Sequence, residues 1–385
     1  FLNFEIANIT PKFKNKFHYK MRFFKKNKLY KIFFILFCFC VAYAQPTHQP
    51  GILLKSNTQQ TGQYYFYTTQ ENSISLHEIN SSFEYYKIWE YVFLDKKEFT
   101  PVSLLFGDVT GNGEQEFIVV GNVFGGATEI YIFQTDNSIP ISEPAIYEIL
   151  SLKKGSRPTK AELFMWDGDK DYEIVMVMSS PERNLIVLDY NINTLQPIKH
   201  KVATQFMENT YGPVKMLKLD QNQDNKGDLI LYTTSATPER YTYNTKNRKE
   251  EIKKINNLKL NKLKIIKTED SVYEILITKD NKAYLENNKE IFLDSPTIDL
   301  LKFNNNIMVQ IAPEEVNRVK LKEDEEVFRL DATIKIPIKD KSINYLYNTS
   351  QNVMLFYDDE MKNPKIVFIK EKLEWQGLTK EEKKK

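Results

Sequence analysis

The sequence predicts an all-β chain, a β-propeller of seven blades that are each a four-stranded antiparallel sheet. Two observations support this prediction. Three short acidic loops in the middle of the chain are each followed at once by an apolar run, and their closing acids, Glu116, Glu173 and Asp228, lie 57 and 55 residues apart. A fixed period of this size is typical of a repeat architecture. Elsewhere, short runs rich in Ile, Val, Tyr and Phe alternate with Asn, Asp, Gly, Lys and Pro, which indicates short strands joined by turns.

Seven units of this pattern follow one another along the chain. Their leading strands are expected at 51–55, 103–106, 162–165, 215–219, 264–267, 299–302 and 343–347. Each unit has room for about four strands of roughly five to six residues, and a radial array of about four to eight such sheets is a β-propeller. The last two units are short, so six or eight blades remain open as alternatives. The Lys- and Asn-rich stretch 247–262 is interpreted as an exposed connection between the fourth and fifth units.

The remaining parts of the chain are assigned by composition. Met21 is interpreted as the native start, which makes residues 1–20 upstream translation that is not native. Residues 21–44 resemble a secretory signal peptide, with a basic segment, thirteen apolar residues and a final Ala-Tyr-Ala. Thirteen residues are fewer than the ~20 that a membrane-spanning helix needs. The propeller is assigned to 45–370 and a charged, solvated tail to 371–385. The mature protein is therefore expected to be secreted, periplasmic or extracellular, without a transmembrane anchor.

Charge and cysteine content narrow the classes of function. Removing the first 44 residues takes away nine of the 53 Lys and Arg and one of the 51 Asp and Glu, so the formal net charge changes from +2 to −6. No basic block indicates nucleic-acid binding. Both cysteines, Cys38 and Cys40, lie in the predicted signal, so the mature chain has neither disulfides nor thiol chemistry. Its stability is expected to come from core burial, assisted by metal.

The acidic loops have the oxygen pattern of a calcium site. Ca²⁺ takes about six to eight oxygen ligands from carboxylates, amides, carbonyls and water. A tight loop can direct alternate side chains inward and add one backbone carbonyl. The predicted ligands are Asp108, Thr110, Asn112, the Glu114 carbonyl and Glu116 in the first loop; Asp167, Asp169 and Glu173, with Asp171 at the carbonyl position, in the second; and Asp220, Asn222, Asp224, the Lys226 carbonyl and Asp228 in the third. The second loop has Met165 at the first ligand position, so whether it binds metal is left open.

The two alternatives to this interpretation are an EF-hand and a solvated turn. An EF-hand needs a Glu at the twelfth loop position between flanking helices. Val119 and Leu231 occupy that position in the first and third loops, within β-type runs, which excludes an EF-hand. The remaining alternative is that these loops are solvated turns rich in Asp and Asn.

The first loop also resembles a known family. The stretch from Phe106-Gly107-Asp108 to Glu116, with the apolar run that ends at Gly121, is similar to the FG-GAP repeat of integrin alpha-chain N-terminal propellers and to the VCBS-type repeats of secreted bacterial relatives. The resemblance covers roughly residues 100–235 and extends to the rest by strand spacing alone. It implies structural calcium ions that brace the loops between the first two strands of a blade, and a binding or adhesion role.

Few residues favour catalysis. The histidines after the signal, His48, His77 and His200, have no metal-ligand spacing, and the sequence has no Gly-x-Ser-x-Gly elbow or phosphate-binding glycine loop. The predicted function is therefore a secreted, calcium-braced propeller that acts as a non-catalytic binding or adhesion module for a protein or glycan. The alternative is a polysaccharide-active enzyme, a lyase or hydrolase, on the same scaffold. The sequence does not identify the ligand.

Overall fold

Short runs of β-branched and aromatic residues form the regular elements of this protein. The computed structural model describes residues 51–55, 64–70, 72–80, 82, 84–93, 99–123, 127–141, 143–150, 156–166, 169, 171–178, 185–190, 197–202, 214–219, 228–233, 239–244, 249–254, 260–267, 272–278, 280, 282–285, 290–291, 296–302, 308–322, 327–336, 343–348, 352–358, 364–369 and 373–376. These residues contain the strands β1 to β29 and no helix, which confirms the predicted all-β class. Accordingly, no helix in the described ranges could cross a membrane. The predicted upstream segment and signal peptide lie outside the described residues.

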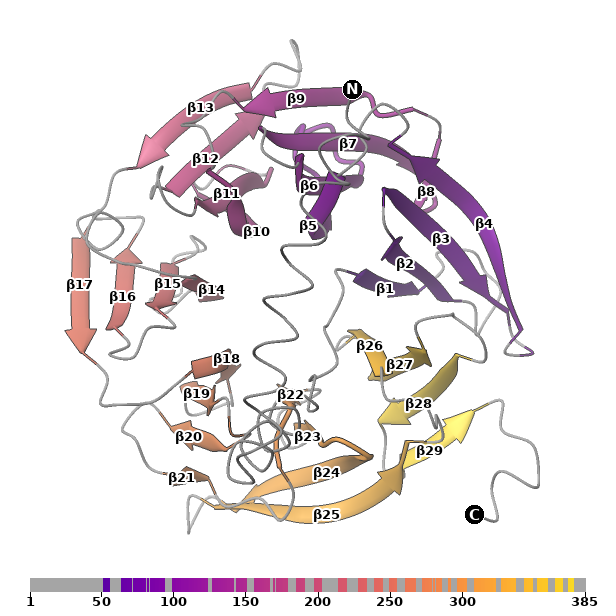
Figure 1. The fold of residues 1–385 in the computed structure, drawn as a ribbon, viewed down its shortest axis with the longest axis vertical. Coiled ribbons are helices and arrows are strands. Elements are labelled where there is room, and N and C mark those ends of the chain that lie inside the picture. The colour runs from indigo at the N-terminus through magenta and orange to yellow at the C-terminus, as the bar shows by residue number, and fades with distance from the viewer. Residues whose placement is uncertain are drawn as a thin grey trace, which may run out of the picture. The chain divides into compact units, whose positions relative to one another are not determined.

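Seven antiparallel sheets, numbered here 1 to 7 along the chain, are each built from consecutive strands (Figure 1). Sheet 1 contains β1 (Gly51–Lys55), β2 (Tyr64–Gln70), β3 (Ser73–Ile79) and β4 (Tyr85–Val92); sheet 2 contains β5 (Phe99–Gly107), β6 (Glu116–Val123), β7 (Thr128–Asp136), β8 (Ile139–Pro140) and β9 (Ile146–Leu150); sheet 3 contains β10 (Pro158–Phe164), β11 (Glu173–Met178), β12 (Leu185–Tyr190) and β13 (Pro197–Val202).

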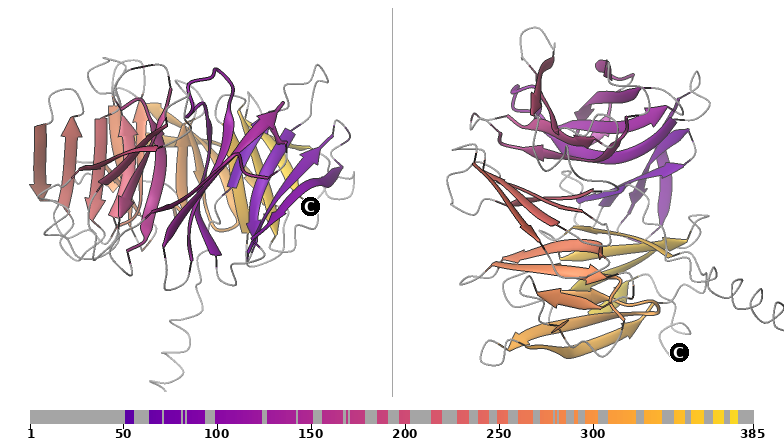
Figure 2. Two further views of the ribbon diagram at one scale, coloured as in Figure 1. Left: turned by 90° about the horizontal axis from the view of Figure 1, so that it is seen from above. Right: turned by 60° about the vertical axis from the view of Figure 1, so that its left-hand side comes forward.

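The second half of the chain repeats this order. Sheet 4 contains β14 (Val214–Leu219), β15 (Asp228–Thr233), β16 (Glu239–Asn244) and β17 (Lys249–Lys254); sheet 5 contains β18 (Leu260–Lys267), β19 (Val272–Thr278), β20 (Ala283–Leu285) and β21 (Glu290–Ile291); sheet 6 contains β22 (Asp299–Lys302), β23 (Met308–Ile311), β24 (Glu315–Lys322) and β25 (Val327–Lys335); sheet 7 contains β26 (Ile343–Asn348), β27 (Val353–Asp358), β28 (Lys365–Ile369) and β29 (Leu373–Gln376). Figure 2 shows the twisted strands of each sheet from two further directions.

The predicted unit starts agree with these sheets, and two boundaries need correction. Each predicted leading strand overlaps the first strand of a sheet, from β1 to β26. The stretch 247–262, predicted as a connection, instead contains β17 and the start of β18. The predicted tail 371–385 contains β29, which pairs with β28, so the last sheet continues past residue 370. β17 and β29 are outer strands, which tolerate the charged residues that also mark linkers.

Sheet 2 departs from the four-stranded pattern. Both β8 and β9 pair with β7, at different parts of its length: β8 with the end around Thr135, and β9 with the stretch from Thr128 to Ile132. Sheet 2 therefore has five strands, with β9 as an outer strand that the period alone does not predict.

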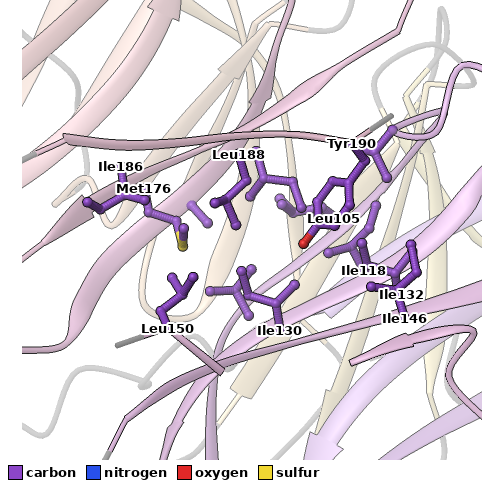
Figure 3. Close-up of a cluster of buried hydrophobic side chains, with 14 of the residues drawn as sticks. Leu105, Ile118, Ile130, Ile132, Ile146, Leu150, Met176, Ile186, Leu188 and Tyr190 are labelled. Carbon is purple, nitrogen blue, oxygen red and sulfur yellow. The ribbon is translucent and has the colours of Figure 1, made fainter. Parts of the chain in front are cut away.

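Apolar side chains between neighbouring sheets form the core. At the contact between sheets 2 and 3, isoleucines of β6 and β7 pack against Met176, Ile186 and Leu188 (Figure 3). Similar clusters join sheets 1 and 2, sheets 3 and 4, and sheets 6 and 7. A further cluster joins sheet 7 to sheet 1, so the first and last sheets of the described chain are neighbours. The leading strands also contact one another, β10 with β14, β14 with β18, and β18 with β22.

Hydrogen bonds between sheets add direction to this packing. The Ser103 hydroxyl accepts a bond from the Ala161 amide at 2.9 Å, which ties sheet 2 to sheet 3. The buried Tyr345 hydroxyl donates to the Asp299 carboxylate at 2.7 Å, which ties sheet 7 to sheet 6. Because apolar packing has no direction of its own, such bonds help to fix how one sheet lies on the next.

Gly121 of β6 lies where the backbone comes too close for a side chain. A Cβ atom there would lie 2.4 Å from Cζ of Phe99 and 2.6 Å from the carbonyl oxygen of Thr100. We expect Gly121→Ala to lower the free energy of unfolding by about 1–3 kcal/mol, because a well-packed core resists an added methyl group. Urea unfolding of both proteins measures this difference. A change below about 0.5 kcal/mol would show that Phe99 moves aside without strain.

Candidate metal centre

The first acidic loop joins β5 to β6 and closes around the carboxylate of Asp108. Its Oδ1 accepts the amide of Gly111 at 2.7 Å, and its Oδ2 accepts the amide of Gly113 at 2.8 Å. Both glycines have left-handed backbones, with φ of 72° and 84°. Glycine adopts this conformation without a steric penalty, so the sequence Gly-Asn-Gly allows the chain to turn its amides toward Asp108.

Glu116 closes the same loop from the start of β6. Its side chain is only 1 % exposed. Oε2 accepts the amide of Val109 at 2.9 Å, while Oε1 accepts the hydroxyl of Thr110 at 2.8 Å and the amide group of Asn112 at 3.3 Å. The carboxylate therefore gathers three parts of the loop around one buried point.

Burial raises the pKa of the Glu116 carboxyl above its ordinary value. Hydrogen bonds from Val109 and Thr110 oppose this shift, and the negative charge of Asp108 adds to it. The folded loop thus holds a carboxylate whose charge is poorly solvated and close to a second carboxylate. A bound cation would lower the pKa of Glu116 and so oppose both burial and the charge of Asp108, since a nearby positive charge favours the ionised carboxylate.

Four predicted side-chain ligands of the first loop therefore come together. Thr110 and Asn112 are joined to Glu116 by hydrogen bonds, whereas Asp108 accepts the amides of Gly111 and Gly113 in the same turn. The Glu114 amide donates to Asn112 Oδ1 at 2.6 Å. All four side chains offer oxygen atoms as metal ligands, and hard oxygen ligands are the type that calcium prefers. In the described arrangement the side-chain oxygens of Asp108, Asn112 and Glu116 accept bonds from the loop, and the Thr110 hydroxyl donates one. No three His, Cys, Asp or Glu side chains in the described residues are grouped to hold a metal. The donor chemistry fits calcium, but binding requires the loop to exchange some of these bonds for the ion.

The second loop repeats one part of this geometry. Glu173 is 3 % exposed, and its Oε2 accepts the amide of Trp166 at 2.6 Å. In both loops the carboxylate accepts the amide of the residue seven positions earlier: Glu173 that of Trp166, and Glu116 that of Val109. Asp169 Oδ1 accepts the Asp171 amide at a longer 3.3 Å, and Asp167 lies outside the described residues. The closing acid is therefore a buried acceptor for the backbone in both loops, a role that the spacing of the acids did not indicate.

The first and second loops touch each other. The amide of Tyr172 donates to the carbonyl oxygen of Asp108 at 2.9 Å. A Cβ atom on Gly111 would lie 3.0 Å from Oδ2 of Asp171, so this carboxylate rests against the turn of the first loop. The spacing predicted a backbone-carbonyl position for Asp171 in its own loop and did not indicate this contact with the neighbouring loop.

The third loop cannot be placed in the same way. Asp220, Asn222, Asp224 and Lys226 lie outside the described residues. Asp228 is the first residue of β15 and pairs in register with Leu219 at the end of β14. This is the backbone position that Glu116 occupies opposite Gly107 and Glu173 opposite Phe164. The three closing acids thus share one place in the repeat.

Comparison with known proteins identifies the fold. No family model matches the chain, and no curated protein matches its sequence. Among solved structures, BBS1N in complex with ARL6DN in mercury-soaked crystals has a TM-score of 0.52 and 12 % identity, over 82 % of this chain and 92 % of that chain. A Bacteroides uniformis protein provisionally assigned as a 6-phosphogluconolactonase has a TM-score of 0.50 and 10 % identity, over 85 % and 95 %. The chain has a propeller-like fold. At these identities the likeness concerns the fold alone.

Proposed function

We propose that this protein is a secreted, seven-bladed propeller of the FG-GAP and VCBS type, braced by structural calcium, that binds another protein without catalysis. The observation that supports it best is the first acidic loop. There, Asp108 and Glu116 accept hydrogen bonds from the loop between the first two strands of a sheet, and the side chains of this loop offer hard oxygen ligands. This is the position at which the resembling family carries its calcium.

The blade assignment is supported by the sheet order. Seven sheets of consecutive strands, each in contact with the next through leading strands or apolar clusters, match the arrangement of propeller blades. The cluster that joins sheet 7 to sheet 1 supports a closed array. We therefore favour seven blades over six or eight.

A structural role for the buried acids favours binding over catalysis. Glu116 and Glu173 each accept a backbone amide in a buried position, so they hold loop shape and are poorly placed to exchange protons with a substrate. The polysaccharide-active alternative needs acids that are accessible and free to transfer protons, and neither of these two residues has that character.

Protein rather than glycan is our choice of partner. The outer strands β4 and β9 expose large apolar side chains: Tyr86, Ile88, Val92, Tyr147 and Ile149. Apolar and aromatic side chains on a surface supply contact area for protein partners. BBS1N, similar in fold, was itself crystallised in complex with a protein, ARL6DN. If the protein bound to a glycan array and to no protein, the partner would be a glycan and this part of the proposal would be wrong.

Thermal unfolding with calcium and with chelator tests the proposal. A ligand present at about 100 times its Kd stabilises the folded state by about 2.7 kcal/mol, so calcium should raise the Tm of the wild-type protein. We expect Asp108→Asn, and the double change Asp220→Ala with Asp224→Ala, each to reduce this rise. The matched control is Glu143→Gln, which removes one negative charge from an exposed residue outside the loops. A Tm that is the same with calcium and with chelator would reject structural calcium and leave the loops as hydrogen-bonded turns.

A further inference from the structure

His77 is a buried histidine without hydrogen-bond partners. It lies on β3 of sheet 1 with 7 % of its surface exposed, and neither Nδ1 nor Nε2 has a partner. Its ring stacks on that of Phe66, with centroids 4.8 Å apart and planes 14° from parallel. The two residues are directly opposite in the pairing of β2 with β3, so they share one face of the sheet. A ring in these surroundings is poorly suited to carry a charge.

This face of sheet 1 packs against sheet 7. We call their apolar contact the seam; it consists of Leu53, Tyr64, Phe66, Ile79, Leu346, Val353, Leu355, Tyr357 and Ile366. Phe66 connects His77 to the seam, because its ring also lies 6.4 Å from the ring of Tyr357 in sheet 7. In the described residues no strand of sheet 1 pairs with a strand of sheet 7. The seam is instead held by side-chain packing and by a bond of 3.1 Å from Asn348 Nδ2 to the Leu53 carbonyl.

The charged groups near His77 do not compensate a proton on its ring. Lys87 of β4 is directly opposite His77 in register and has the same sign as a protonated histidine. Glu90 has the opposite sign, but its Oε2 accepts Lys87 Nζ at 2.9 Å and its Oε1 accepts the Ser75 hydroxyl at 3.3 Å. Among the described side chains of the seam, the other titratable groups are the tyrosines Tyr64, Tyr85 and Tyr357.

We propose that the seam is an acid-sensitive joint, in which protonation of His77 loosens the contact of sheet 7 with sheet 1. The proton would add a positive charge to a ring that stacks on Phe66 and has no acceptor for its N–H groups. Opening the seam hydrates that ring, so the open form accepts the proton more readily than the closed form. No other histidine is among the side chains that the structure describes, so we expect the other sheet contacts to hold at the same pH.

The direction of the pH effect follows from the pKa. Burial, and to a lesser extent the charge of Lys87, lower the pKa of His77 from 6.5 to about 4, and Glu90 acts against this shift. The open form, with a pKa near 6.5, binds more protons than the closed form between these values. Closure is therefore strongest above pH 6.5 and weakens as the pH falls toward 4, below which the loss is complete. Between about pH 7.5 and about pH 5.5 the opening equilibrium should rise up to about tenfold.

Hydrogen exchange of the full chain, measured by mass spectrometry at those two pH values with calcium held constant, tests this proposal. After correction for intrinsic exchange rates, peptides from β1–β3 and β26–β28 should exchange up to about tenfold faster at the lower pH. Peptides from β11 and β12 of sheet 3 should not change. We expect His77→Phe to remove the pH response, since it keeps the aromatic ring and loses the titrating group. The control His200→Gln, in β13 of sheet 3, should keep the response.

Either of two results would overturn the proposal. The first is equal corrected exchange at the seam at both pH values, and the second is an acid response that persists in His77→Phe. If that variant fails to fold, an NMR titration of the imidazole signals of the wild-type protein decides the matter. A folded-state pKa near 6.5 for His77 would show that the closed seam tolerates the charge.

Discussion

Replacing Glu116 with alanine is expected to lower the free energy of unfolding by about 2–4 kcal/mol. The carboxylate is buried and accepts bonds from Val109, Thr110 and Asn112. Hydrogen bonds to a charged group contribute roughly 1.5–3 kcal/mol, and a buried donor left without its partner costs roughly 1–3 kcal/mol. The Val109 amide would be such a donor. Urea unfolding of both proteins without calcium measures this loss of free energy in the absence of any contribution from the ion.

The control for this change is two residues away. Glu114→Ala removes the same charged group from an exposed position whose side chain is not among the predicted ligands, so we expect a change below about 0.5 kcal/mol. Equal losses in the two variants would mean that loop charge, rather than the buried bonds of Glu116, determines stability. With calcium present, the difference between the variants should increase if the ion also binds Glu116.

Phe117→Ala should cause a still larger loss, about 3–5 kcal/mol, because it leaves a cavity in the contact between sheets 1 and 2. The Phe117 side chain is fully buried. Its ring stacks on Tyr67 with centroids 4.0 Å apart, and the rings of Trp89 and Phe133 lie at 6.3 Å and 5.9 Å. Tyr67 also donates its hydroxyl hydrogen to the carbonyl of Ser138, so the stack and this bond hold the same two sheets together.

Equilibrium unfolding followed by tryptophan fluorescence suits this variant, since Trp89 is beside the substituted ring. The control is Ile141→Ala, which shortens an apolar side chain that is 61 % exposed and should change stability by less than about 0.5 kcal/mol. A loss below about 1 kcal/mol in Phe117→Ala would show that the aromatic cluster collapses into the space and that the two sheets are held mainly elsewhere.

The repeat of the closing acids predicted the positions of the sheets. Glu116, Glu173 and Asp228 each begin the second strand of a sheet, so their period also gave the spacing of the leading strands. Apolar alternation extended that spacing to both ends of the described chain. Strands on the outside of a sheet were harder to predict, because they meet water on one side and can carry charge. For this reason β29 was assigned to a tail and the second partner of β7 was missed.

The sequence predicted which residues share the first acidic loop, but it did not predict the hydrogen bonds that they make. Spacing along a loop predicts which residues can meet, as it did for Asp108, Thr110, Asn112 and Glu116. It does not predict whether an oxygen faces an ion or a backbone amide, because both need the same inward direction. Contacts between loops, such as that of Asp171 with Gly111, depend on how two sheets pack. The stacking of His77 on Phe66 likewise required the strand register.

Because each sheet is built from consecutive strands, most of the chain can assemble in order of synthesis. The seam is the exception, since Asn348 and Leu53 are separated by 295 residues. Bringing such distant segments together has an entropic cost that grows with the length between them, so this contact is expected to form last. Until then the apolar face of sheet 1 that contains Phe66 has no cover. A chain that stops before β26 would keep that face exposed, as a site for aggregation or for capture by a chaperone.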